Sequence, residues 1–184
     1  MTSRISTTFA QAAALPAILT SPSTHAIPTG SWTLYFHEPE DKSWTPDSYK
    51  RICSIGTWEA LGTVLREMGS HRTVNGMMFA MRGDTSPLWE NKANIRGGSY
   101  CIKVSRKAAA EAYQRYLAAA ALGVVTDPEN PIVGVTMSPK KGFCIIKLWN
   151  AHARTFNKSS DIAILHEEVR AEEILYRPHT DQKM

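Results

Sequence analysis

The sequence predicts an antiparallel β-sheet backed by three helices on one face, which is the α+β class. Segments in which apolar and polar residues alternate, the period of a half-buried strand, recur along the chain. Tight-turn signals such as Asn75-Gly76 separate several of these segments, and tight turns favour antiparallel pairing. Three segments with helical character interrupt the strands.

Length and composition fit one folded domain with a tail. The chain has 184 residues, enough to bury a core without disulfides. Residues 1–24 hold one basic and no acidic residue and are predicted to be a disordered tail, whereas 25–184 are predicted to form the single domain. No stretch approaches the ~20 apolar residues of a membrane span, so no membrane partner is predicted. Three cysteines without Cys-x-x-Cys spacing indicate free thiols in a reducing compartment.

The first half of the predicted domain holds three strands and one helix. The strands are expected at 31–36, 49–55 and 77–81. The helix is expected over 57–68, with Thr57 as its N-cap. Its apolar residues Trp58, Leu61, Leu65 and Met68 fall on one stripe, the side that faces a core.

The second half is predicted to add four strands and two helices. The strands are expected at 100–104, 132–137, 143–149 and 174–176. A long Ala-rich helix, which Ser105 can cap, is expected to run to about Leu122, where Gly123 ends it. The last helix is expected over 160–173. The hairpin loop 138–142 exposes charged residues.

Enzyme signatures are absent from the sequence. There is no phosphate-binding loop of the Walker type, no G-x-S-x-G elbow and no H-E-x-x-H helix. Arg66-Glu67-Met68 is similar to a fragment of the nucleotide-diphosphate hydrolase motif, but Gly69, Ser70 and His71 stand where acidic magnesium ligands are needed. We therefore predict a protein that is not an enzyme and needs no cofactor or metal.

Two of the five tryptophans stand in polar loops. Trp44 and Trp89 lack the apolar periodicity that would give an indole a core position. Either both are partly buried loop anchors, or their rings face each other across a slot one base wide. Glu90 offers two acceptor oxygens that match the adjacent N–H donors of guanine. Lys140 and Lys141 in the hairpin loop would then hold phosphates, in keeping with a net charge of +4.

At these residues the sequence resembles the messenger-RNA cap-binding translation initiation factor 4E family, over about 25–179. Five short segments carry the resemblance in order: Trp32–Phe36, Lys42–Trp44, Pro87–Glu90, Arg96–Gly98 and Ile145–Trp149. The resemblance implies a curved antiparallel sheet with three α-helices on its convex face. That expectation agrees with the fold class predicted from periodicity.

The resemblance also implies roles for individual residues. Trp44 and Trp89 would sandwich the 7-methylguanine, and Glu90 would accept its N1 and N2 hydrogens. Trp149 would contact the 7-methyl group. Lys140 and Lys141, in the hairpin before that tryptophan, would hold the triphosphate.

One departure from the family pattern affects the phosphate site. Ser99 stands directly after Arg96-Gly97-Gly98, where the family usually has an arginine that touches phosphate. A phosphate contact is therefore either missing or supplied by another basic residue. Arg154 and Lys158 are the residues expected to supply it.

A second departure affects the helices that bind protein partners in the family. Gly62 stands where the family has a dorsal tryptophan on the first helix, and Trp58 lies one turn earlier. On the second helix a Leu-Glu pair becomes Leu117-Ala118. Trp58, Gly62 and Leu117 are thus the predicted partner-binding residues, in a non-standard mode.

The function predicted from the sequence is binding of the 7-methylguanosine cap of messenger RNA, for translation initiation or its regulation. The expected partners are capped messenger RNA and, on the convex face, an initiation factor 4G-type scaffold or a 4E-binding regulator. The expected location is the cytoplasm, with some presence in the nucleus. A general single-stranded RNA-binding module is the alternative, and a nucleotide hydrolase without its metal site is a third reading.

Overall fold

The computed structural model describes residues 25–68 and 75–181. One antiparallel sheet, with the strand order β2-β1-β3-β5-β6-β4-β7, organises this part of the chain. The strands are β1 (Trp32–His37), β2 (Lys50–Ile55), β3 (Met77–Arg82), β4 (Gly98–Ser105), β5 (Ile132–Pro139), β6 (Phe143–Asn150) and β7 (Leu175–Pro178). All seven predicted strands are confirmed, with ends that move by no more than a few residues.

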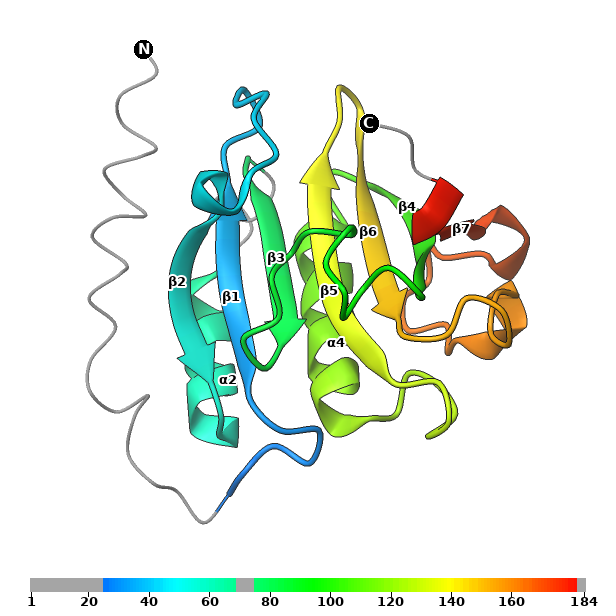
Figure 1. Cartoon of the computed structure of the whole chain (residues 1–184), viewed down its shortest axis with the longest axis horizontal. Helices are drawn as coiled ribbons and strands as arrows, with labels where there is room; N and C mark the ends of the chain where they lie inside the picture. Colours follow the sequence, from blue (N-terminus) through cyan, green and yellow to red (C-terminus); the bar gives the residue numbers. More distant parts are fainter. Residues whose placement is uncertain (1–24, 69–74, 182–184) are drawn as a thin grey trace.

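Two α-helices, α2 (Trp58–Glu67) and α4 (Ala109–Leu122), lie on the same face of the sheet (Figure 1). Short 3-10 helices complete the described elements: η2 (Pro46–Ser48), η3 (Ser159–Asp161), η4 (Ala171–Glu173) and η5 (His179–Asp181). The fold class and the single helical face are confirmed. The helix count differs, because the described residues contain two α-helices rather than three.

The segment predicted as the third helix, 160–173, instead forms η3 and η4 joined by irregular backbone. Ile162 pairs with Thr126 in an isolated β-bridge, and the amide of Ala163 donates to the carbonyl of Val125. Ile162 and Val169 are both buried against the core. These long-range contacts favour an extended segment over the local helical preference.

The boundaries of the two α-helices follow local chemistry. The Thr57 hydroxyl accepts from the amide of Ala60, as predicted for the N-cap of α2. Gly123 ends α4 with a positive φ of 75°, also as predicted. Ser105, predicted to cap this helix, ends β4 opposite Phe143, and its hydroxyl accepts from the amide of Ala108, directly before α4 begins at Ala109.

The core lies between the sheet and the two helices. Alternate strand residues such as Trp32, Leu34 and Tyr100 pack there with the Ala-rich side of α4. The three cysteines are free thiols. No helix in the described ranges has the length and apolar character needed to cross a membrane. The predicted tail, 1–24, lies outside the described residues.

Candidate functional site

A cavity of about 600 Å³ lies on the sheet face opposite the helices, between the sheet and two loops. It brings together four of the residues predicted for base recognition: Trp44, Trp89, Glu90 and Trp149. Its other lining residues are Lys42, Thr45, Tyr49, Met77, Phe79, Pro87, Leu88, Thr136, Ser138 and Lys147. Figure 1 shows the green loop between β3 and β4, which carries Trp89 and Glu90, crossing this face.

Trp44 is 50% exposed, and the rings of His37 and Tyr49 lie beside its indole. Its indole stacks on the ring of His37, with centroids 4.3 Å apart and planes 6° apart. His37 is fully buried, and its two ring nitrogens lie 2.8 Å and 2.9 Å from the carbonyl oxygens of Glu38 and Ser43. A half-exposed indole fixed against an immobilised ring can stack a further flat group with little loss of conformational entropy.

Asn94 fixes the loop that carries Trp89 and Glu90. Its buried side-chain amide donates to the carbonyls of Ser86, at 2.9 Å, and Leu88, at 2.7 Å. The loop is therefore anchored on the sheet side, while Trp89 and Glu90 remain at the cavity wall. Asn94 is a positioning residue that the sequence reasoning missed.

Trp149 is 4% exposed and lies on β6. The ring of His179 packs edge-on against its indole, with centroids 4.7 Å apart. Nδ1 of His179 lies 2.7 Å from the carbonyl oxygen of Asn94, and Nε2 lies 2.8 Å from the Ser99 hydroxyl. Burial lowers the pKa of His179, which favours a neutral ring that donates through Nδ1 and accepts from Ser99. His179 thus ties Trp149 to both the loop and the sheet.

The two glycines of the Arg96–Gly98 segment are required by close backbone approach. A Cβ on Gly97 would lie 1.8 Å from the carbonyl oxygen of Asn150. A Cβ on Gly98 would lie 2.2 Å from the hydroxyl of Tyr176. The glycines therefore let β4 enter the sheet beside β6 and β7, at the end of the strand that supports Trp149.

The basic residues predicted for phosphate binding do not line the cavity. Lys140 and Lys141 are exposed at the turn between β5 and β6. Arg154 lines a separate cavity of about 700 Å³ together with Arg96 and His152. Lys158 precedes η3, and its backbone amide donates to Asp161.

Lys147 is the basic residue on β6 that lines the cavity, and sequence reasoning missed it. The signal was present, because Lys147 stands two residues before Trp149 and strand residues two apart share a face. Phe79 and Thr136 reach the cavity by the same alternation, since register pairs Phe79 with Thr136 and Thr136 with Lys147. Tyr49 is buried at the cavity wall, where burial and the charge of Glu90 raise its pKa.

The predicted partner-binding residues on the helices divide into two groups. Trp58 is half-buried, and Gly62 faces open space apart from the end of the Arg66 side chain. Leu117, in contrast, is fully buried in the core beneath α4. The prediction for Leu117 is therefore corrected, because its side chain has no exposed surface to offer a partner.

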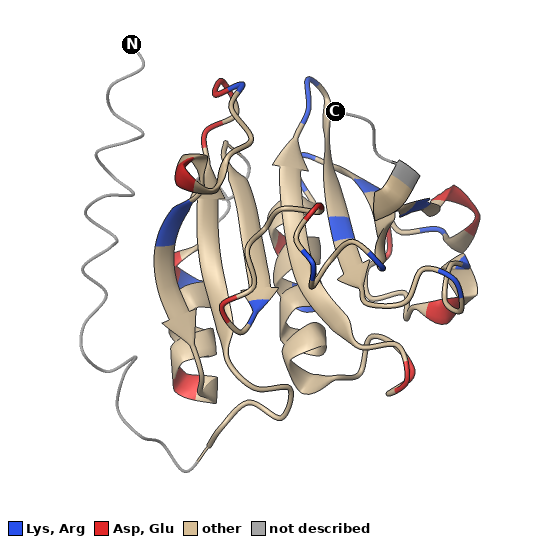
Figure 2. Ribbon diagram, in the orientation of Figure 1, with Lys and Arg blue, Asp and Glu red and all other residues tan. Residues whose placement is uncertain are grey.

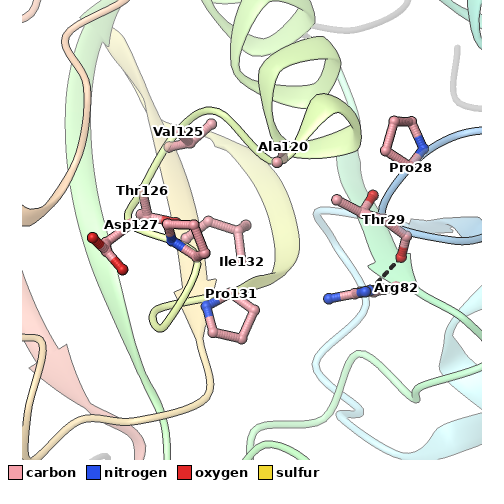
Figure 3. A pocket seen from close by; sticks show the side chains of 11 residues that line it. Pro28, Thr29, Arg82, Ala120, Val125, Thr126, Asp127, Pro131 and Ile132 are labelled. Atoms are coloured by element: carbon pink, nitrogen blue, oxygen red, sulfur yellow. Dashed lines mark hydrogen bonds between the residues drawn. The ribbon is translucent and has the colours of Figure 1, made fainter.

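A smaller cavity of about 220 Å³ lies near the end of α4 (Figure 3). Arg82 lines it and donates from Nε to the carbonyl of Thr29. Pro131 and Ile132 from the segment entering β5 complete the wall seen in Figure 3. None of the residues predicted to function lines this cavity.

Comparison with known proteins identifies the family. The model of the family described as eukaryotic initiation factor 4E matches residues 29–184. The chain belongs to the eukaryotic initiation factor 4E family. The initiation factor 4E of Saccharomyces cerevisiae is 26% identical over 125 residues, which cover 64% of this chain and 58% of that protein. The Dictyostelium discoideum factor is 23% identical over 158 residues, 82% of this chain and 63% of that protein. The matches thus span about three fifths of these 4E relatives.

Solved structures of 4E-family proteins share the fold. The complex of Caenorhabditis elegans eIF4E-3 with the 4E-binding protein Mextli and cap analog has a TM-score of 0.68 and 16% identity, covering 85% of this chain and 94% of that one. The complex of Ascaris suum eIF4E-3 with m7G cap has a TM-score of 0.59 and 19% identity, covering 71% and 76%. The curved antiparallel sheet is therefore the 4E-family fold.

Proposed function

We propose that this 4E-family chain binds the 7-methylguanosine cap of messenger RNA and acts in translation initiation or its regulation. The observation that carries the proposal is the single cavity that Trp44, Trp89, Glu90 and Trp149 line together. Each of these residues supplies a different part of the recognition, and the family relationship supports the same ligand.

The two loop tryptophans bind the base by stacking. Methylation at N7 makes guanine a delocalised cation, so an indole on each face adds a cation–π contribution to ordinary stacking. Stacking on an aromatic ring contributes roughly 1–3 kcal/mol per base. Trp149, against the buried ring of His179, is the residue that contacts the methyl group.

Glu90 selects guanine among the bases. Its two carboxylate oxygens accept the N1 and N2 hydrogens, a pair of adjacent donors that adenine does not present on that edge. Lys140 and Lys141, at the β5–β6 turn, interact with the phosphates of the cap or of the following nucleotides. Arg154 and Lys158 stay predictions as further phosphate contacts.

The chain acts by binding in the cytoplasm and carries out no reaction of its own. On the helix face it engages a 4G-type scaffold or a 4E-binding regulator through Trp58, with Gly62 leaving an open surface one turn away. Whether the outcome is activation or repression of translation depends on which partner occupies that face.

Retention on immobilised 7-methyl-GTP tests the proposed ligand. The protein should elute with free 7-methyl-GTP and stay bound when the same concentration of GTP is added. Glu90→Gln offers one acceptor and one donor in place of two acceptors, so one N–H of the base loses its partner. We expect this variant to bind about 1–3 kcal/mol more weakly and to lose its preference for guanine over methylated adenine.

A general single-stranded RNA-binding module is the second candidate function. Such a protein would elute equally with GTP and 7-methyl-GTP, because neutral and methylated bases both stack on indoles. It would also keep its affinity when Glu90 is changed to Gln. Either result would contradict cap-specific binding.

A further inference from the structure

Three basic residues lie at or near the cavity without acidic partners. Lys147 lines the cavity, Arg177 lies on β7, and Lys140 follows the end of β5. Figure 2 shows Lys and Arg residues on β6, at β7 and at the turn between β5 and β6. Within residues 25–68 and 75–181, none of the three forms an ion pair with a carboxylate. A cluster of uncompensated cations attracts an anionic ligand.

Strand register puts Arg177 on the cavity face of the sheet. Ser99 on β4 pairs with Trp149 on one side and with Arg177 on the other. Residues directly opposite each other across a ladder point to the same face, and Trp149 lines the cavity. Tyr176, the preceding residue, packs against the buried ring of Tyr100 on the core side, so Arg177 is on the opposite face.

The same register places Lys147 close to Ser99 and Arg177. Lys147 pairs with Cys101, which stands two residues after Ser99 on the same face of β4. Burial raises the pKa of the Cys101 thiol, and the positive charges of Lys147 and Arg177 oppose that rise. Both cations therefore lie within electrostatic range of the half-buried Cys101 thiol, on the two strands that flank β4.

The cations also act on one another. Burial lowers the pKa of Lys147, the Cys101 thiol opposes that shift, and the positive charges of Arg177 and Lys140 add to it. Burial and two nearby like charges both disfavour the charged form of this ammonium group. A bound anion removes that repulsion, so the arrangement favours ligands that carry several negative charges.

Ser99 cannot provide the positive charge itself. Its side chain is fully buried, and its hydroxyl bonds to Nε2 of His179. The ring of His179 covers Ser99, so a positive charge on this face comes from the strands on either side of β4. We propose that Arg177 and Lys147, with Lys140 at the rim, bind the phosphates attached to the base in the cavity. The cation absent at position 99 thus comes from the adjacent strand, an inference that rests on the proposed function.

A series of ligands that differ only in phosphate number tests this subsite. Titration by tryptophan fluorescence should give affinities that rise from 7-methylguanosine through its 5′-monophosphate and diphosphate to 7-methyl-GTP. Arg177→Gln and Lys147→Gln should each reduce the affinity for 7-methyl-GTP about tenfold, as expected for a charge-assisted hydrogen bond. Their affinity for 7-methylguanosine should stay within twofold of the parent's, and thermal melts should check that they fold.

Two further variants show where on the protein the phosphates bind. Arg66→Gln removes one positive charge on α2, which lies on the opposite face of the sheet from the cavity. It should leave the affinities for all four ligands unchanged. Arg154→Gln removes the arginine that lines the neighbouring cavity, a residue predicted as a further phosphate contact, and so tests that cavity as the alternative subsite. If Arg154→Gln alone loses the gain from added phosphates, the subsite lies there and the assignment to Arg177 and Lys147 is wrong.

The remaining outcomes separate this inference from the proposed function. Full retention of the phosphate gain in Arg177→Gln overturns the inference, and so does an equal loss for 7-methylguanosine, because that marks a structural role. If the parent binds no 7-methylguanosine ligand, the proposed function fails. Calorimetry with inorganic tripolyphosphate then tests the phosphate subsite by itself. Binding to the parent that is weaker in Arg177→Gln supports the subsite, and absence of binding overturns it.

Discussion

The two faces of the sheet use aromatic residues in opposite ways. On the helix face, Tyr113 and Tyr116 are fully enclosed between α4 and the strands. On the cavity face, Trp44 is half-exposed, stacked on the ring of His37 and tilted against that of Tyr49. The first arrangement stabilises the fold by burial, and the second keeps an aromatic surface available for a ligand. Stability and binding should therefore respond to different substitutions.

The largest effect should come from the helix face. Leu117 is fully buried, and Leu117→Ala leaves a cavity in the core. We expect a loss of about 2–5 kcal/mol in the free energy of unfolding, measured by chemical denaturation. The folded fraction should bind 7-methyl-GTP with the affinity of the parent. A weaker affinity at unchanged stability would mean that the two faces are coupled.

The second largest effect concerns Trp58, which combines a contact that stabilises the fold with a proposed role in partner binding. It packs against the core, and its backbone amide donates to the carbonyl of His25 in the segment before β1. As a central anchor for a helical partner, Trp58→Ala should weaken binding of a 4G-type scaffold by about 2 kcal/mol or more and leave 7-methyl-GTP binding intact. If Trp58 is only structural, the melting temperature and both activities should fall together. Co-precipitation beside a thermal melt distinguishes these outcomes.

The elements of the fold could be predicted where local sequence and tertiary contacts agree. The strand period of two and the caps at Thr57 and Gly123 depend on neighbouring residues, and they appear where expected. The segment 160–173 could not be predicted, because its conformation depends on Thr126 and Val125, far along the chain. A bridge between distant segments leaves no mark on local periodicity.

The residues of the candidate site also divide into those that the sequence predicts and those that it does not. Trp44, Trp89 and Glu90 could be found because aromatic and acidic residues in polar loops lack a core explanation. Asn94 and His179 could not be found, since their role depends on hydrogen bonds across the sheet and the loop. Neither residue belongs to a motif, and each looks like an ordinary polar residue in the sequence.

Removing one indole from the cavity should have the third largest effect. Trp44→Ala and Trp89→Ala should each weaken 7-methyl-GTP binding ten- to a hundredfold, which is about 1.4–2.8 kcal/mol. The melting temperature of Trp44→Ala should change little, because its indole is half-exposed. Fluorescence titration measures the affinity, and ligand-induced quenching should decrease in both variants. Unchanged affinity in both would exclude the stacking arrangement.

The smallest effect is a pH dependence that links the cavity to the core through His179. Burial lowers its pKa below the ordinary value of 6.5, so the folded protein binds this proton more weakly than the unfolded chain does. Its contribution to stability is complete above about pH 6.5 and is lost as the pH falls through the lower pKa of the folded state. Hydrogen bonds lower the carboxyl pKa values of Asp41 and Glu168, whose contributions are lost only at more acidic pH.

Thermal melts from pH 7.5 down to 5.5 should thus show a falling melting temperature. His179→Gln can keep a donor toward Asn94 and an acceptor toward Ser99 without titrating, so its profile over this range should be flatter. An equally steep profile in this variant would assign the pH dependence to other groups and leave His179 a purely geometric support for Trp149.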